Sequence, residues 1–160
     1  MREIKFRGKS KLVIEELEEL CVEHSNGWVY GNLIMYEETP YIVGDFIEVD
    51  PEYTINEFWI PVIPESVGQY TGLKDKNGRE FFEGDIITWQ DKPLFSDSEK
   101  SEKLKDIIGF EDGCFRTKIY SVLLSNLARI EKTGFKFNYL THHETEIIGN
   151  IYENPELLGG

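Results

Sequence analysis

The stretch from Gln69 to Trp89 (QYTGLKDKNGREFFEGDIITW) constrains the fold more than any other part of the chain. Apolar residues stand on both sides of a polar Lys-Asp-Lys-Asn-Gly-Arg tip, which indicates two strands joined by a tight turn. Asn77-Gly78 is a pair that hairpin turns favour, because both residues accept positive φ angles. A second pair, Gly84-Asp85, interrupts an apolar run and predicts a bulge or bend of the kind that small barrels use. The cations of the tip, Lys74, Lys76 and Arg79, are expected to lie in water and to matter little for stability. The stretch predicts a folding element, and nothing in it predicts a reaction.

Four more blocks accompany this signature stretch: MREIKFR at the start, GWVYGNL from residue 27, PESVGQ from residue 64 and IIGNIYENPELL from residue 147. Together they resemble the YopX family of small phage and prophage proteins. The resemblance implies a fold and no activity, so it supplies no catalytic or cofactor-binding residue. The residues interpreted as a structural signature are Gln69, Tyr70, Thr71, Gly72, Leu73, Asp75, Asn77, Gly78, Glu83, Gly84, Asp85, Gly149 and Asn150.

Charge is distributed unevenly along the chain, whose net charge is −13. Residues 1–11 carry five basic side chains against one acid, whereas residues 12–73 contain thirteen acids and no lysine or arginine. Such a surface repels phosphates, so direct nucleic-acid binding is disfavoured. The acidic run is interpreted as solvated surface that keeps the protein soluble, and the alternative is mimicry of DNA.

Length and composition predict a folded protein without covalent staples. The chain has 160 residues, of which 40% are hydrophobic and 13% aromatic, enough for one domain or two small ones that share a core. Cys21 and Cys114 lie far apart without a CxxC spacing, which favours reduced, buried thiols. No apolar run approaches the ~20 residues of a membrane span, and the N-terminus lacks an apolar signal core. We expect a protein of the bacterial host cytoplasm that contacts no membrane.

Hydrophobic periodicity predicts strands and one helix in the first half. Arg2–Arg7 alternates as a strand does, and apolar residues recur at helical spacing from Val13 to His24, with Ser10 as the expected cap. Strands are expected at 28–36, at 41–49 with a bend at Gly44, and at 58–63, where Pro61 restricts the strand to an edge or a strand end. The aromatic residues predicted to be core are Trp28, Tyr30, Tyr36, Tyr41, Phe46, Tyr53, Phe58 and Trp59.

The second half is predicted to alternate strands and loops. Residues 90–105 are polar and predict a mobile loop. Asp112-Gly113 predicts a short hairpin turn, and residues 121–131 are interpreted as a connection. The last strands are expected at 135–140 and 145–150. A short helix is expected to follow, with Asn154 as its N-cap and Pro155 in its first position.

One cluster has the composition of a metal site: His142, His143, Glu144 and Glu146. Adjacent histidines on a strand point to opposite faces, and no HExxH helix is present. These four residues are therefore weak candidates, and a solvated turn is the preferred interpretation. We expect no metal, no cofactor and no catalytic residue, because no serine or cysteine lies in a nucleophile motif.

The sequence as a whole predicts a mainly β, β-rich α+β fold. An N-terminal β region with an inserted helix (residues 1–68) is expected to pack as one compact unit with a small SH3-like or OB-like barrel (residues 69–160). The expected function is that of a non-catalytic phage or prophage accessory protein. It would act through protein–protein contacts, as a homo-oligomer or with a host or phage protein. The alternative is an acidic DNA mimic that inhibits a host nuclease or DNA-binding protein through Glu15–Glu23 and Glu37–Glu57. A metal-dependent enzyme comes third.

Overall fold

The computed structural model describes residues 3–91, 102–119 and 145–159. The fold is mainly β with antiparallel sheets, and the described residues contain one α-helix. The chain divides into two compact units, Met1–Tyr70 and Thr71–Gly160. From the sequence, the boundary was expected between residues 68 and 69.

The first unit is built on an antiparallel sheet with the strand order β6-β3-β2-β1-β7. Its strands are β1 (Phe6–Lys9), β2 (Trp28–Tyr36), β3 (Thr39–Val43), β6 (Trp59–Pro61) and the first residues of β7 (Gly68–Lys74), and a 3-10 turn, η1 (Pro64–Ser66), precedes β7. Buried side chains of the sheet, of the helix region and of Val62 form the core of this unit, which consists of Leu17, Val22, Val29, Ile42, Ile60 and Val62. The strand expected at Arg2–Arg7 begins only at Phe6, whose partner is Gly31.

The helix α1 (Ile14–Glu19) is shorter than the predicted Val13–His24. It ends because Cys21 adopts a left-handed φ of 55°. The Val22 N–H then donates to the Leu17 carbonyl at 2.9 Å and the Cys21 N–H to the Glu18 carbonyl at 3.0 Å. This is the Schellman pattern, in which Val22 packs with Leu17 in the core. Ser10 does not cap the helix, because its hydroxyl accepts the N–H of Leu12.

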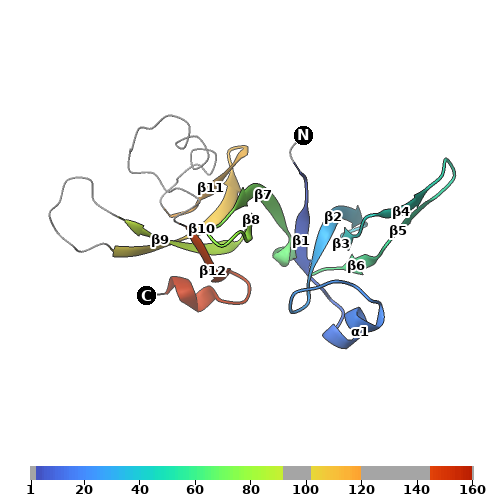
Figure 1. Ribbon diagram of the computed structural model, residues 1–160, viewed down its shortest axis with the longest axis horizontal. Coiled ribbons are helices and arrows are strands. Elements are labelled where there is room, and N and C mark those ends of the chain that lie inside the picture. The colour runs from blue at the N-terminus through green and yellow to red at the C-terminus, as the bar shows by residue number, and fades with distance from the viewer. Residues whose placement is uncertain (1–2, 92–101, 120–144, 160) are drawn as a thin grey trace. The chain divides into compact units, whose positions relative to one another are not determined.

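The predicted strand at 41–49 is broken at the expected bend, Gly44. β3 ends at Val43, and β4 (Phe46–Val49) pairs with β5 (Thr54–Asn56) as a separate two-stranded sheet. Hydrogen bonds across the bend, from Gly44 N–H to the Phe58 carbonyl and from Glu57 N–H to the Asp45 carbonyl, keep the two arms paired. Figure 1 shows the β4–β5 hairpin extending beyond β3 and β6. Pro61 lies on β6, at the sheet edge, as predicted.

Half of the aromatic residues predicted to be core are at the surface. Tyr36, Phe46, Tyr53 and Trp59 are exposed, which contradicts the prediction for these four. Trp28 is buried, and Tyr30, Tyr41 and Phe58 are partly buried. The exposed residues fall on the hairpin, at the β2–β3 turn and on the edge strand. No second layer among the described residues of this unit covers them.

The second unit contains a four-stranded antiparallel sheet with the order β11-β10-β9-β12. The elements are β8 (Glu80–Phe82), next to β7, then β9 (Asp85–Asp91), β10 (Glu102–Glu111), β11 (Cys114–Thr117), β12 (Glu146–Asn150) and the 3-10 helix η4 (Pro155–Leu158). The core consists of Phe81, Ile87, Trp89, Ile108 and Phe115. Barrel closure is not among the pairings of these described strands, so the SH3-like or OB-like barrel stays a prediction.

Several elements of this unit confirm predictions made from the sequence. Asp112 and Gly113, with φ of 51° and 77°, form the predicted turn between β10 and β11. The strand at 145–150 and the helix at Pro155 are confirmed, although the Asn154 side chain makes no capping hydrogen bond. The predicted loop at 90–105 is wrong at both ends, because β9 reaches Asp91 and β10 starts at Glu102. The segments 121–131 and 135–140 lie outside the described residues.

The cysteines are free, as predicted for reduced thiols. Cys21 is exposed and Cys114 is partly buried, so the expectation of buried thiols is wrong for Cys21. Within the described part of the chain, no helix has the length and apolar character to span a membrane.

Candidate functional site

The turn between β7 and β8 is organised by the buried carboxylate of Asp75, whose side chain is 0% exposed. Its Oδ1 accepts the main-chain N–H of Asn77 at 2.8 Å and that of Arg79 at 2.9 Å. An aspartate that accepts N–H groups two residues ahead is typical of a locally closed turn. The first acid of the polar tip therefore holds the rest of the tip in place.

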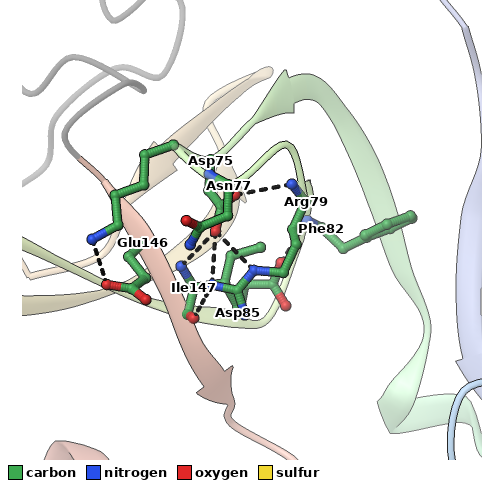
Figure 2. A network of polar contacts seen from close by, with 8 residues as sticks. Asp75, Asn77, Arg79, Phe82, Asp85, Glu146 and Ile147 are labelled. Atoms are coloured by element: carbon green, nitrogen blue, oxygen red, sulfur yellow. Dashed lines mark hydrogen bonds and ion pairs between the residues drawn. The ribbon is translucent and has the colours of Figure 1, made fainter.

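The other oxygen of Asp75 connects this turn to β12. Oδ2 accepts hydrogen bonds from the Ile147 N–H at 3.2 Å and from Arg79 Nε at 2.9 Å. It also forms an ion pair with Arg79 Nη2 at 2.8 Å. Arg79 also donates from Nη2 to the carbonyl of Ile147, which closes the network that Figure 2 shows. Two guanidinium N–H groups thus converge on one carboxylate oxygen, and hydrogen bonds between ionised groups are stronger than neutral ones. Residues 72 positions apart are thus joined at one buried oxygen.

These contacts set the ionisation of Asp75. Burial favours the neutral acid, but hydrogen bonds from the main chains of Arg79, Ile147 and Asn77 and from the Arg79 side chain favour the carboxylate, so the pKa of Asp75 lies below its ordinary value. A carboxylate held in its charged form by five bonds is suited to fixing a structure. It is poorly suited to exchanging protons near neutral pH.

The turn differs from the predicted Asn-Gly type. Gly78 has a φ of 81°, whereas Asn77 has no positive φ. The Gly78 N–H donates to the Asp75 carbonyl at 2.9 Å and the Asp75 N–H to the Arg79 carbonyl at 2.8 Å. This is a type I turn followed by one left-handed glycine, the longer class of hairpin connection. Arg79 was expected in water at the tip, and that interpretation is wrong because it is bound to Asp75.

Two further signature residues hold turns in the same way. Asp85 is 1% exposed and its Oδ2 accepts the Phe82 N–H at 2.8 Å, which closes the Glu83-Gly84 turn between β8 and β9. The Gly84-Asp85 pair therefore marks a bend, as predicted. Asn150 Oδ1 accepts the N–H groups of Tyr152 and Glu153 at 3.0 Å and 2.9 Å.

The remaining signature residues are also placed by the backbone or the core. Gln69 pairs with Phe6, Tyr70 and Thr71 are buried, Leu73 packs against the core of the second unit, and Gly72 has a φ of 88° within β7. Gly149 leaves room for η4, because a Cβ there would lie 2.5 Å from Asn154 Oδ1 and 2.9 Å from Leu157 Cδ1. The signature thus encodes turns and close approaches, and none of its described contacts outlines a reaction centre.

The weak metal candidates are only partly described. His142, His143 and Glu144 lie outside the described residues. Glu146 forms an ion pair with Lys76 Nζ at 2.6 Å, and this hydrogen bond lowers the pKa of its carboxyl. Residues 3–91, 102–119 and 145–159 contain no group of three potential metal ligands. The expectation that no metal binds stays a prediction.

The surface feature that sequence reasoning missed is the hairpin of residues 44–57, called here the ribbon. Phe46, Ile47 and Val49 are 62%, 67% and 68% exposed, and Tyr53 and Ile55 are also exposed. A register shift between Phe46 and Glu48 marks a bulge in β4. Large apolar side chains gathered on one exposed element are typical of protein-interaction sites. The ribbon is the best candidate for a functional surface among the described residues.

The ribbon is acidic as well as apolar. Its acids are Asp45, Glu48, Asp50, Glu52 and Glu57, all exposed, and it contains no lysine or arginine. The hydroxyl of Tyr53 donates to the Glu48 carboxylate at 2.7 Å, and this bond raises the pKa of Tyr53. Asp50 closes the tip by accepting the Glu52 N–H at 3.0 Å. Local bonds therefore order a ribbon whose apolar side chains face solvent.

The fold and the network around Asp75 define a small, mainly β protein whose signature residues fix its turns. The chain belongs to the YopX family, whose model, described as YopX protein, matches residues 7–159. It is also similar to the crystal structure of protein EF1440 from Enterococcus faecalis, with 25% sequence identity, a TM-score of 0.52 and coverage of 99% of both chains. No curated protein matches the chain.

Proposed function

We propose that this YopX-family protein is a non-catalytic accessory protein of a phage or prophage that acts in the bacterial cytoplasm by binding another protein. The observation that carries this proposal is the ribbon, where Phe46, Ile47 and Val49 face solvent on a two-stranded sheet. Isolated two-stranded hairpins are marginally stable in water. A hairpin that keeps its apolar residues outside gains most when a partner covers them.

The described contacts of the signature residues do not outline a reaction centre. The side-chain oxygens of Asp75, Asp85 and Asn150 accept hydrogen bonds from main-chain N–H groups of turns. The metal-dependent enzyme, third among the expected functions, gains no support from Glu146, because that carboxylate is paired with Lys76. Both observations favour a binding function.

Self-association is a second part of the proposal. Ile151 and Tyr152 follow β12 and are 39% and 37% exposed, so the C-terminal segment also presents apolar surface. A second copy of the chain would cover such a surface by closed symmetry. This contact would use residues of the second unit, whereas the ribbon belongs to the first.

Capture of partners from a host lysate by the immobilised protein tests the proposal. The test variant carries Phe46→Ser and Val49→Ser, and the matched control carries Val13→Ser and Leu20→Ser, which remove apolar side chains 58% and 59% exposed on the first unit's helix region. We expect one or more proteins that the wild type and the control retain and the ribbon variant loses. Identical sets of proteins on all three would refute the ribbon as the contact.

A DNA mimic is the second candidate, because residues 12–73 hold thirteen acids and no lysine or arginine, and Glu15, Glu18 and Glu19 are exposed on α1. A mimic's partner is a DNA-binding protein, so duplex DNA should displace the chain from it. Displacement by DNA together with loss of binding in a Glu15→Gln, Glu18→Gln, Glu19→Gln variant would favour mimicry. Retention in excess DNA would favour the ribbon contact.

A further inference from the structure

The outer edge of the ribbon is continuous with the edge of the main sheet of its unit. β5 pairs with β4 and β6 pairs with β3, and the Glu57 and Phe58 bonds across the bend join the two ladders. Residues 54–60, called here the edge strand, therefore consist of β5, a bend at Glu57 and the start of β6, and their inner side is paired with β4 and β3. On its outer side, β6 is the edge of its sheet as far as Pro61, whose carbonyl accepts the Lys11 N–H at 2.9 Å. β5 is the edge of the two-stranded sheet, among the residues that the structure describes.

The side chains of this edge strand are sorted by face. Ile60 is buried and Phe58 packs against the core of the first unit, whereas Ile55, Glu57 and Trp59 are exposed. Alternating residues of a strand share a face, so the three exposed residues form one row with an acid between two apolar groups. The ring of Trp59 meets that of Tyr41 edge-on at 6.4 Å, which supports it from the neighbouring strand.

Soluble proteins protect open edges with lysine, proline or a bulge. On the β4 side, the register shift between Phe46 and Glu48 supplies a bulge. On the other side, residues 54–60 contain no lysine and no proline, and Pro61 stands only at the far end. Apart from the bend and the charge at Glu57, the edge from Thr54 to Ile60 therefore carries none of these protecting features.

We propose that residues 54–60 accept a β-strand from a different protein, and that this strand alternates basic and apolar residues. The inference rests on the proposed function, because it names the partner of the same surface. Main-chain bonds along the edge would give affinity, and side chains packed on Ile55 and Trp59 would give specificity. A lysine or arginine of the partner would face Glu57, with Asp45, Glu48, Asp50 and Glu52 adding to the attraction.

Charge decides against a second copy of the ribbon as the occupant. A two-fold contact places the same patch on both sides, so the five acids of one ribbon would meet the five of the other. No lysine or arginine occurs between residues 12 and 73 to offset them. A nucleic acid is disfavoured for the same reason, because its phosphates would meet the same carboxylates.

The test uses the full chain and synthetic peptides as probes. The first probe is a ten-residue peptide that alternates lysine with valine. The second has the same sequence with N-methyl groups on alternate residues, which remove the donors that a strand contributes. The third alternates glutamate with valine. We expect the first peptide to bind at least about tenfold more tightly than the other two, with affinity that falls as salt rises.

Matched variants locate the contact. Ile55→Lys places an edge-blocking charge in the row, and Leu20→Lys makes the same kind of change at the end of α1. Glu57→Lys is paired with Glu19→Lys, and all four positions are exposed. We expect the two variants at 55 and 57 to bind the basic peptide about tenfold more weakly, and the two controls to change by less than about twofold. Circular dichroism of each variant shows that it is folded.

Four outcomes would overturn the inference. Equal binding of the N-methylated peptide means that no strand is added, and equal losses in test and control variants mean that only net charge matters. Failure of the basic peptide to bind, with self-association lost in Ile55→Lys, makes a second copy the occupant. If the basic peptide fails while the Phe46→Ser, Val49→Ser variant still loses its captured partner, the inference falls and the proposed function stands. If that variant loses no partner, the proposed function itself fails.

Discussion

The carboxylate of Asp75 accepts the main-chain N–H of Ile147 at 3.2 Å, which fixes the signature turn to a strand 72 positions later in the chain. The turn is a local structure, yet its central acid satisfies a donor of β12. This bond joins the sequence blocks around residues 69–89 and 147–158. They form one structural element in the second unit.

Replacement of Asp75 by asparagine should lower the free energy of unfolding by about 2 kcal/mol, because hydrogen bonds to a charged acceptor are lost and an amide N–H₂ faces the Arg79 donors. Urea unfolding measures the change. Asp112→Asn is the matched control, because Asp112 is 82% exposed and its ion pair with Arg116 is a surface contact. The control should change stability by less than about 0.5 kcal/mol. Equal effects at both positions would contradict the role of Asp75.

The same pair of proteins reports a pH dependence. The pKa of Asp75 is lower in the folded protein than its ordinary value of 3.8. A depressed pKa stabilises the folded state above the unfolded pKa, and that stability is lost as pH falls through the folded pKa. The difference between wild type and Asp75→Asn should therefore be constant from neutral pH to about pH 4 and shrink below it. A difference that stays constant down to pH 2 would show that folding does not lower the pKa of Asp75.

Arg79 and Lys74 were both expected to be dispensable surface cations, and the structure separates them. Arg79 binds the buried Asp75, whereas Lys74 approaches Glu80 at 3.7 Å in the exposed part of the hairpin. Arg79→Ser should cost about 1–2 kcal/mol in thermal or urea unfolding, since it leaves a buried carboxylate with fewer donors. Lys74→Ser should cost less than about 0.5 kcal/mol. The reverse order would refute the network.

Gly78 tests the conformation of the turn. A Cβ at this position meets no atom within 4 Å, so any cost of substitution arises from its φ of 81°. Gly78→Val should destabilise by about 1–3 kcal/mol, because a β-branched residue resists the left-handed region. Gly78→Asn should cost clearly less, because asparagine tolerates that region. Equal melting temperatures for both variants would contradict the turn assignment.

The sequence predicted what local rules decide. Asp112-Gly113 forms the expected turn, in which both residues adopt positive φ. Asn77-Gly78 failed as the same type because the buried carboxylate of Asp75 captures the N–H groups of Asn77 and Arg79 and imposes a different turn. Spacing alone does not reveal that a nearby acid is buried.

The ribbon was missed for a related reason. Phe46 and Tyr53 have the residue types of a core, and only the break at Gly44 takes them away from one. The helix was overestimated because the apolar spacing continues past Leu20, whereas Cys21 reverses the chain. Whether a side chain is buried depends on what its strand or helix packs against. The sequence pattern of that strand or helix does not reveal its packing partner.

Self-association is checked by light scattering. We expect a mass above the 18.6 kDa of one chain, because apolar residues of the C-terminal segment such as Ile151 remain exposed in a single copy. Dilution over about two orders of magnitude should lower the mass if assembly follows mass action. A constant 18.6 kDa over that range would refute a homo-oligomer.

The central claim is that the ribbon and its edge strand bind a partner protein. Hydrogen–deuterium exchange of the full chain, with and without the partner that the wild type captures, tests it most directly because exchange reports which main-chain N–H groups become protected. The account predicts new protection between residues 44 and 60, with little change at the Asp75 turn, whose N–H groups are already bonded. Protection confined to the Asp75 turn or to α1, with residues 44–60 unchanged, would contradict it.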